Sequence, residues 1–242
     1  NDIFFAIKGK KNDGNKFIAQ SFKRKASLAI VNKIQNKFNN KHQIKVKNTL
    51  KFLTDVSKAF RKGIDTKVIA ITGSCGKTTL KELLGNVLSK ISKVSISTKS
   101  YNNKFGVPLS LFNLKQNDEY GILEVGMDKK GEIDYLSKII EPNVGVITNI
   151  NYAHAKNFKN IKQIALAKSE IIKNIRPNGF VVLNADDNFY KLHKKISHKK
   201  NLKVISFGIK SLKANIKLIN IKPLGKKFKI NISCNNKNKF FL

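Results

Sequence analysis

The sequence predicts an α/β protein with a small N-terminal α/β segment and a larger part built on a mostly parallel sheet. From Lys67 onward, strand-like runs alternate with helical patterns, which favours a parallel sheet covered by helices. After residue 214, apolar and polar residues alternate without a helical pattern, which indicates antiparallel strands. Residues 1–47 carry their own strand, turn, helix and strand. We therefore expect two domains, 1–47 and 48–242.

Each expected element has a local signal. In the N-terminal segment, "DIFFAIKG" reads as a strand, Asp13-Gly14 as a turn, "KFIAQSFKRKA" as a helix and "SLAIVNK" as a strand. Residues 48–62 carry apolar side chains at helical spacing, and Gly63 ends that helix and marks a second candidate boundary. In the larger part, the strand-like runs are "KVIAIT", "YGILEV", "NVGVITNI", "GFVVLNA" and "LKVISFG".

The composition suits a globular protein. Of the 242 residues 41% are hydrophobic, and no apolar run approaches the roughly 20 residues of a membrane span. No signal peptide is visible. The chain begins at Asn1 and enters a strand at once, so we expect its natural N-terminus to be missing. The cysteines, Cys75 and Cys234, lie far apart, which argues against a disulfide framework and favours a cytoplasmic location.

The net charge of +33 raises the question of nucleic-acid binding. Only Arg24, Arg61 and Arg176 of the 48 basic residues are arginine, the residue that makes bidentate contacts to phosphate and guanine. The lysines are spread along the chain among many Asn, Ile and Phe residues, all encoded by A- and T-rich codons. We therefore favour a biased genome over a specific nucleic-acid partner, and expect only weak, salt-sensitive adhesion to polyanions.

The stretch "VIAITGSCGKTTLKELLGNVL" places a glycine-containing turn between a strand and a helix. The usual phosphate loop is G-x-x-x-x-G-K-[ST], but its first glycine falls on Ile71, and Gly73 precedes Gly76 by only three residues. Backbone N–H groups at such a turn bind anions with help from the helix dipole. We predict a nucleotide site in which Lys77 neutralises the β- and γ-phosphates and Thr78 binds Mg²⁺. An ordinary strand-to-helix turn is the alternative.

Two more polar residues lie at the ends of predicted strands. Glu124 ends "YGILEV", and His154 follows "NVGVITNI". Ligands of parallel sheets bind at the carboxyl ends of the strands, so Glu124 is a candidate second metal ligand. The position of His154 at the same sheet edge makes it a candidate too. A solvated strand-end glutamate and an ordinary loop histidine are the alternatives.

Lys168 lies on the apolar face of the helix predicted around it. It is one turn from Ile164 and from Ile171, whereas Lys162 and Lys173 fall off that face. A buried lysine is costly unless it is paired or chemically altered, and burial lowers its pKa. A neutral amine can take up CO₂ to give a carbamate, whose oxygens suit Mg²⁺. By periodicity alone, a lysine whose ammonium reaches solvent at the rim of the stripe is favoured.

Six segments occur in an order and spacing that resemble the Mur ligases: "ITGSCGKTT", "YNNKFGVPLSL", "ILEVGMDKKGEIDYL", "VGVITNINYAHAKNF", "IALAKSEII" and "VVLNADD". This family is similar in using a loop without the extra glycine. The N-terminal "DIFFAIKGKKNDGNKFIAQSF" also looks like the domain that holds the UDP end of the substrate in members that add D-Ala-D-Ala to UDP-N-acetylmuramoyl-tripeptide. The resemblance implies an ATP- and Mg²⁺-dependent amide ligase of peptidoglycan synthesis, working through an acyl phosphate.

The resemblance also implies roles for individual residues. Lys77, Lys168, His154 and Glu124 would be catalytic, with Mg²⁺ held by Thr78, Glu124, His154 and carbamylated Lys168. The nucleotide would contact the loop and three asparagines, although the loop positions of these asparagines alone favour turn residues. The residues so implied are Gly73, Ser74, Cys75, Gly76, Lys77, Thr78, Thr79, Asn102, Asn103 and Asn184.

One part of the family pattern has no counterpart in the sequence: the third, C-terminal domain and the G-x-H-N-x-x-N segment that leads to it. We therefore expect a monomeric fragment, made of the substrate-anchoring domain and most of the ATPase domain, that is poorly active or inactive by itself. A folate-type ligase of the same superfamily, a nucleic-acid-linked NTPase and a non-catalytic nucleotide-binding module are the alternatives. The N-terminal segment and Thr79 argue against the folate-type ligase.

Overall fold

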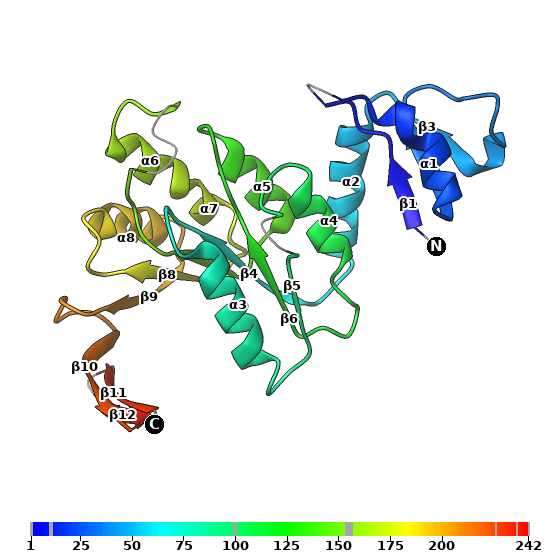
Figure 1. Ribbon diagram of the computed structural model, residues 1–242. Coiled ribbons are helices and arrows are strands. Elements are labelled where there is room, and N and C mark those ends of the chain that lie inside the picture. Colours follow the sequence, from blue (N-terminus) through cyan, green and yellow to red (C-terminus); the bar gives the residue numbers. More distant parts are fainter. Residues whose placement is uncertain are drawn as a thin grey trace. The chain divides into compact units, whose positions relative to one another are not determined.

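The computed structural model describes residues 2–9, 12–98, 101–152, 157–225, 227–235 and 237–241 (Figure 1). The chain forms two compact units, Asn1–Gly63 and Ile64–Leu242, which are considered separately. In these described residues, none of the helices has the length and apolar character needed to cross a membrane.

The first unit is a parallel three-stranded sheet in the order β1-β2-β3, with helices packed on it. Its core contains Ala6, Ile18, Ala29 and Val31, with partly buried aromatic side chains packed against them. The elements are β1 (Asp2–Phe5), η1 (Gly14–Phe17), α1 (Ile18–Lys23), β2 (Ala26–Val31), η2 (Asn40–His42), β3 (Gln43–Lys45) and α2 (Thr49–Lys62).

Helix α2 belongs to the first unit, whereas the sequence analysis placed the domain boundary after residue 47. The helix begins at a cap in which the Asn48 side chain accepts a hydrogen bond from the Lys51 backbone N–H. The buried Thr49 hydroxyl donates to the carbonyl of Ala6, at 3.1 Å, which ties the first helical turn to the end of β1. The division between the units therefore falls at Gly63, the second candidate position.

The second unit is a nine-stranded sheet in the order β12-β11-β10-β9-β8-β7-β4-β6-β5. The strands from β5 to β10 pair in parallel, and β10, β11 and β12 pair antiparallel, as the sequence predicts. The short strand β5 was not predicted from the sequence. The strands are β4 (Lys67–Thr72), β5 (Val94–Ile96), β6 (Tyr120–Glu124), β7 (Val144–Ile147), β8 (Phe180–Asn184), β9 (Lys203–Gly208), β10 (Ile216–Leu224), β11 (Lys227–Cys234) and β12 (Lys237–Phe241).

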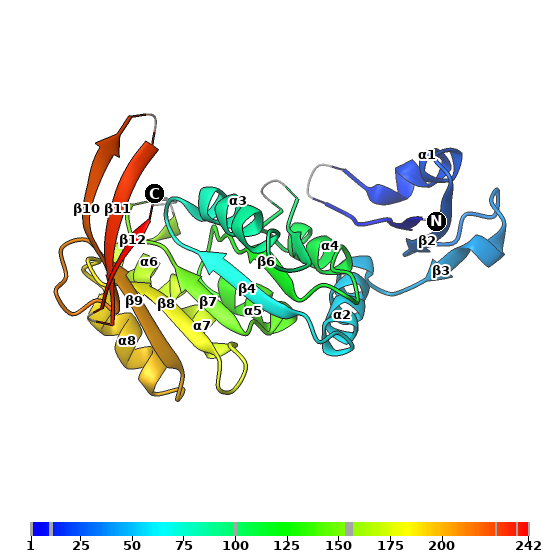
Figure 2. The same ribbon diagram turned by 90° about the horizontal axis from the view of Figure 1, so that it is seen from below.

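The helices of this unit divide unequally between the two sides of the sheet (Figures 1 and 2). Helix α3 lies on one side, and α5, α7 and α8 lie on the other. This follows from right-handed crossover connections. The connection from β4 to β5 crosses the sheet in one direction, and the later connections, from β5 through β6, β7 and β8 to β9, cross it in the other. The helices are α3 (Lys77–Leu88), α4 (Gly106–Phe112), α5 (Glu132–Ile140), α6 (Ile161–Lys168), α7 (Glu170–Lys173) and α8 (Tyr190–His198).

Helix α3 is apolar on more than one face. Leu80, Leu84 and Leu88 pack onto a cluster around Ile71 and Ile122 of the sheet. A second apolar stripe faces solvent: Leu83 and Val87 of the helix, and Ile91 in the turn that follows it, are exposed by 57%, 60% and 78%. The helix is thus packed on the sheet along one side and left uncovered along the other.

Helix α8 is anchored by a buried histidine. His193 is 2% exposed, and its Nε2 lies 3.1 Å from the carbonyl oxygen of Ala165 in α6. Loss of hydration lowers the pKa of His193, while the hydrogen bond to Ala165 and the charge of Asp187 oppose that shift in part. The neutral imidazole is therefore the form that the folded protein favours.

We predict that acid weakens the fold through His193. The unfolded chain takes up a proton near the ordinary histidine pKa of about 6.5, whereas the folded chain resists it, so stability is present above this pH and is lost as the pH falls below it. Thermal unfolding between pH 7.5 and 5.5 should show a smaller drop in midpoint for His193→Gln than for the parent. His198→Gln, on an exposed site of the same helix, should behave as the parent. Equal drops in all three chains would contradict the prediction.

Candidate functional site

The predicted phosphate loop, Gly73 to Gly76, joins strand β4 to helix α3. Gly73 has a φ of 149° and Gly76 a φ of 80°, both in the region that favours glycine. Gly73 also passes so close to β7 that a Cβ atom there would lie 1.8 Å from the Thr148 hydroxyl. The Thr148 hydroxyl itself donates to the carbonyl of Cys75, at 2.7 Å. The loop is thus pressed against the residue that follows β7.

The segment after β7 holds the rest of the loop. The Ser74 backbone N–H donates to the carbonyl of Asn149, at 2.9 Å, and the Cys75 N–H donates to the Asn149 side chain, at 3.0 Å. The Ser74 hydroxyl donates to the carbonyl of Asn151 and accepts from its N–H. Thr148, Asn149 and Asn151 were not predicted from the sequence, although a polar residue at the end of a predicted strand was the signal that identified Glu124.

Two lysines converge on the carbonyl of Gly73. Lys77 Nζ, from the first turn of α3, donates to it at 3.0 Å, and Lys168 Nζ, from the end of α6, donates at 2.9 Å. Lys168 lies 95 residues from Gly73 in the chain and Lys77 only four, yet both ammonium groups meet the same carbonyl oxygen of the loop. The structure therefore brings together the two lysines that the sequence analysis selected.

Lys168 is buried rather than at the rim of its helix. Only 2% of the residue is exposed. Burial, which is the largest cause, and the positive charge of Lys77 together lower the pKa of Lys168 to about 7, while Cys75 opposes the shift. The alternative in which the ammonium reaches solvent is wrong, because the side chain is enclosed and its hydrogen bond runs inward to Gly73.

A second group of polar side chains surrounds Glu124 at the end of β6. The Thr78 hydroxyl donates to Glu124 Oε2, at 2.7 Å, and Asn102 Nδ2 donates to Oε1, at 2.8 Å. Glu124 is 2% exposed, so the alternative hypothesis, that it is a solvated glutamate at a strand end, is wrong. It shares the α3 side of the sheet with Ile122 because strand residues alternate between faces.

The remaining candidates are placed differently. The Asn103 side chain accepts from the N–H groups of Phe105 and Gly106 at the start of α4. Asn184 Nδ2 donates to the carbonyl of Thr148, at 3.3 Å, beside the residues that support the loop. Thr79 is exposed on α3. His154 lies outside the described residues.

The donors around Glu124 suit a magnesium ion. The Thr78 hydroxyl and the Glu124 carboxylate supply hard oxygen atoms, which Mg²⁺ prefers. In the described ranges, which leave out 153–156, no three His, Cys, Asp or Glu side chains gather as a metal site. A metal at this position would therefore depend on a hydroxyl and one carboxylate, completed by ligands of another kind.

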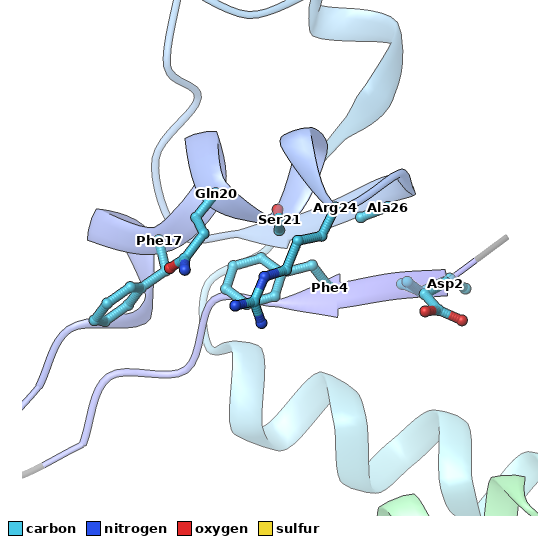
Figure 3. A pocket seen from close by; sticks show the side chains of 8 residues that line it. Asp2, Phe4, Phe17, Gln20, Ser21, Arg24 and Ala26 are labelled. Carbon is cyan, nitrogen blue, oxygen red and sulfur yellow. The ribbon is translucent and has the colours of Figure 1, made fainter.

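The first unit carries two hollows of its own. A hollow of about 690 Å³ has both apolar and polar side chains in its lining, and the polar ones include Lys8, Asp13, Asn15, Lys33 and Lys47. A shallower groove of about 260 Å³ lies between β1 and α1, where Phe4, Phe17, Gln20 and Arg24 line it (Figure 3). In Figure 3 the Arg24 guanidinium lies in front of the Phe4 ring. Three cationic side chains around the larger hollow suit a ligand with phosphate groups.

Comparison with known proteins gives a consistent result. The profile of the Mur ligase middle domain matches residues 71–241. The UDP-N-acetylmuramoyl-tripeptide–D-alanyl-D-alanine ligase of Rickettsia prowazekii is 38% identical over 98% of this chain and 52% of its own length. The ligase of the same description from Buchnera aphidicola (strain APS) is 37% identical over 91% of this chain and 48% of its own. The chain thus spans about half the length of these relatives.

Solved structures agree with the sequence comparison. A crystal structure of MurF from Acinetobacter baumannii superposes with a TM-score of 0.87 at 32% identity, covering 99% of this chain and 51% of that one. MurF ligase from Thermotoga maritima, in complex with ADP, gives a TM-score of 0.84 at 26% identity, with 99% and 54% covered. Structures of FPGS from L. casei share the fold at 14% identity. This chain belongs to the Mur ligase family.

Proposed function

We propose that this chain is the nucleotide-binding part of an ATP-dependent ligase that joins D-Ala-D-Ala to UDP-N-acetylmuramoyl-tripeptide. The observation that carries the proposal is the meeting of Lys77 and Lys168 at the Gly73 carbonyl. The names of the relatives supply the substrates. We further propose that the protein works as a monomer in the cytoplasm, without a specific nucleic-acid partner.

The proposed reaction has two steps. A carboxylate oxygen of the tripeptide attacks the γ-phosphorus of ATP, and ADP leaves, which gives an acyl phosphate. The amine nitrogen of D-Ala-D-Ala then attacks the acyl carbon, phosphate leaves, and the nitrogen loses a proton. Lys77 would exchange its hydrogen bond to Gly73 for the phosphate oxygens, where its charge offsets the charge that moves between them.

Thr78, Glu124, His154 and Lys168 are the proposed holders of Mg²⁺. Bound Mg²⁺ would neutralise phosphate charge and orient the γ-phosphate for attack. The lysine joins this set as a carbamate: its nitrogen forms a bond to the carbon of CO₂ and releases one proton. The carbamate nitrogen keeps one hydrogen, so the bond to the Gly73 carbonyl can persist while the new oxygens turn to the metal. The enclosure of Lys168 supports this reading.

The larger hollow of the first unit is the proposed site of the UDP end of the substrate. Lys8, Lys33 and Lys47 would contact the diphosphate, and the side chains of Asn15 and Asp13 supply groups that can hydrogen-bond a ribose or a base. This assignment uses only residues of the first unit, so it can be tested separately from the nucleotide site.

We predict that nucleotide binding depends on Lys77 and responds to bicarbonate through Lys168. A charge-assisted hydrogen bond contributes about 1.5–3 kcal/mol, so Lys77→Ala should weaken binding of a fluorescent ATP analogue with Mg²⁺ by about ten-fold or more. Bicarbonate should strengthen binding by the parent chain but leave Lys168→Ala unchanged. Lys162→Ala, on the exposed side of the same helix, is the matched control and should respond as the parent does. Unaltered binding by Lys77→Ala would refute the proposed site.

We predict that Gly73→Ala disrupts the same site. The added Cβ would meet the Thr148 hydroxyl at 1.8 Å, and its φ of 149° is strained for alanine. Strain and overpacking each cost about 1–3 kcal/mol, so affinity for the analogue should fall about ten-fold or more. Gly131→Ala tests strain without the clash, because Gly131 has a φ of 88° and no atom within 4 Å of the added Cβ. It should bind the analogue as the parent does. Parent-like binding by Gly73→Ala would show that the loop can move freely.

We predict that UDP binds the first unit through its lysines. Titration of the chain with UDP, followed by calorimetry, should give binding that weakens with salt and is reduced by Lys47→Ala, because this change removes one of the charges lining the hollow. Lys23→Ala, an exposed lysine outside the lining, should bind UDP as the parent does. Equal loss in both variants would mean that only the general charge of the chain attracts UDP.

A further inference from the structure

Lys81 is a buried lysine that the proposed reaction does not use. It lies in α3 one turn after Lys77, and none of its surface is exposed. Lys81 Nζ donates to the carbonyl of Ser97, at 2.6 Å, and forms an ion pair with Glu82 Oε1, at 3.0 Å. Burial of an ammonium group is costly unless such partners are present, so this charge holds a defined position.

The partner of Lys81 is a junction in the sheet. Ser97 follows β5, and its backbone N–H donates to the carbonyl of Ile122, at 2.9 Å. Its hydroxyl accepts from the backbone N–H of Glu124, at 3.3 Å. Ser97 is 1% exposed. Ser97 is therefore hydrogen-bonded to two residues of β6, Ile122 and Glu124, and the second of these carries the carboxylate of the candidate metal site.

Asn102 is bonded to the same part of the sheet as Ser97. Asn102 Nδ2 donates to Glu124 Oε1, and the Asn102 carbonyl accepts from the N–H of Gly126, at 2.8 Å. Ser97 and Asn102 are thus both hydrogen-bonded to Glu124 or to its neighbours in the chain. Thr78, three residues before Lys81 on the same helix, donates to the other oxygen of that carboxylate.

We propose that Lys81 is a positioning residue for the metal site: by fixing Ser97 to α3, it holds Glu124 and Asn102 in register with Thr78. This inference rests on the proposed function. A hydrocarbon side chain at position 81 would leave the Ser97 carbonyl without its cationic partner and release Ser97 from the helix. The phosphate loop precedes α3 and is held by hydrogen bonds that do not involve Lys81, so we expect nucleotide binding without metal to be independent of Lys81.

The test separates nucleotide binding from its dependence on metal. The chain is titrated with N-methylanthraniloyl-ADP, in EDTA and again with Mg²⁺, for the parent, Lys81→Met and Glu82→Gln. Loss of residues that support metal ligands commonly weakens metal binding about 10–100-fold. Lys81→Met should therefore bind the nucleotide in EDTA as tightly as the parent does. The increase in nucleotide affinity on adding Mg²⁺ should be about ten-fold smaller than in the parent. Glu82→Gln keeps the contact to Ser97, and its side chain is 48% exposed, so it should match the parent.

Each outcome decides the matter. An unchanged Mg²⁺ gain in Lys81→Met overturns the inference, and so does an equal loss of affinity with and without metal, which would mark a purely structural role. If Lys81→Met fails to fold, Lys81→Gln decides, because its side chain carries no charge to bury and is too short to keep the bond to the Ser97 carbonyl. A reduced Mg²⁺ gain in that variant supports the inference, and an unchanged gain overturns it. A parent chain that binds no nucleotide overturns the proposed function together with the inference.

Discussion

The candidate site depends on the absence of a side chain at Gly73. Because the backbone there meets the Thr148 hydroxyl at a distance that no Cβ atom could occupy, the loop can lie directly on the end of β7. In that position the Ser74 backbone N–H of the loop donates a hydrogen bond to the carbonyl of Asn149, which follows β7. It also aims the Gly73 carbonyl inward, where Lys77 and Lys168 reach it from two different helices. One close approach of backbone to side chain thus links β4, β7, α3 and α6.

Signals within a single element predicted much of this arrangement. Strand and helix periodicity predicted the parallel sheet, its antiparallel extension and the place of Lys168 on the apolar face of its helix, because burial of one face leaves a regular trace in the sequence. Periodicity alone nevertheless favoured an ammonium group that reaches solvent, and the structure buries it. Glu124 was identified by a different signal, its place at the carboxyl end of a predicted parallel strand, where ligands of such sheets bind. The N-terminal α/β segment was also predictable, since its turn and apolar runs lie close together in the chain.

The remainder depends on contacts between distant residues. Nothing local to Lys81 indicates that its ammonium ends at the Ser97 carbonyl, since a lysine on a helix is ordinarily solvated. Asn103 was assigned to the nucleotide by resemblance, yet its side chain bonds the N–H groups that begin α4. The place of α2 in the first unit likewise rests on the bond from Thr49 to Ala6, 43 residues away. Periodicity shows which face of a helix or strand is buried, but it does not show which distant residues that face packs against.

The uncovered stripe of α3 affects how copies of the chain behave toward one another. Leu83, Val87 and Ile91 face solvent while the chain carries a net charge of +33. Exposed apolar stripes draw molecules together, and like charge holds them apart. At physiological ionic strength this repulsion is screened beyond about 8 Å, whereas the apolar stripe is unaffected by such screening. The colloidal state of the isolated chain is therefore governed by ionic strength, with dilute buffer keeping it dispersed and added salt promoting self-association.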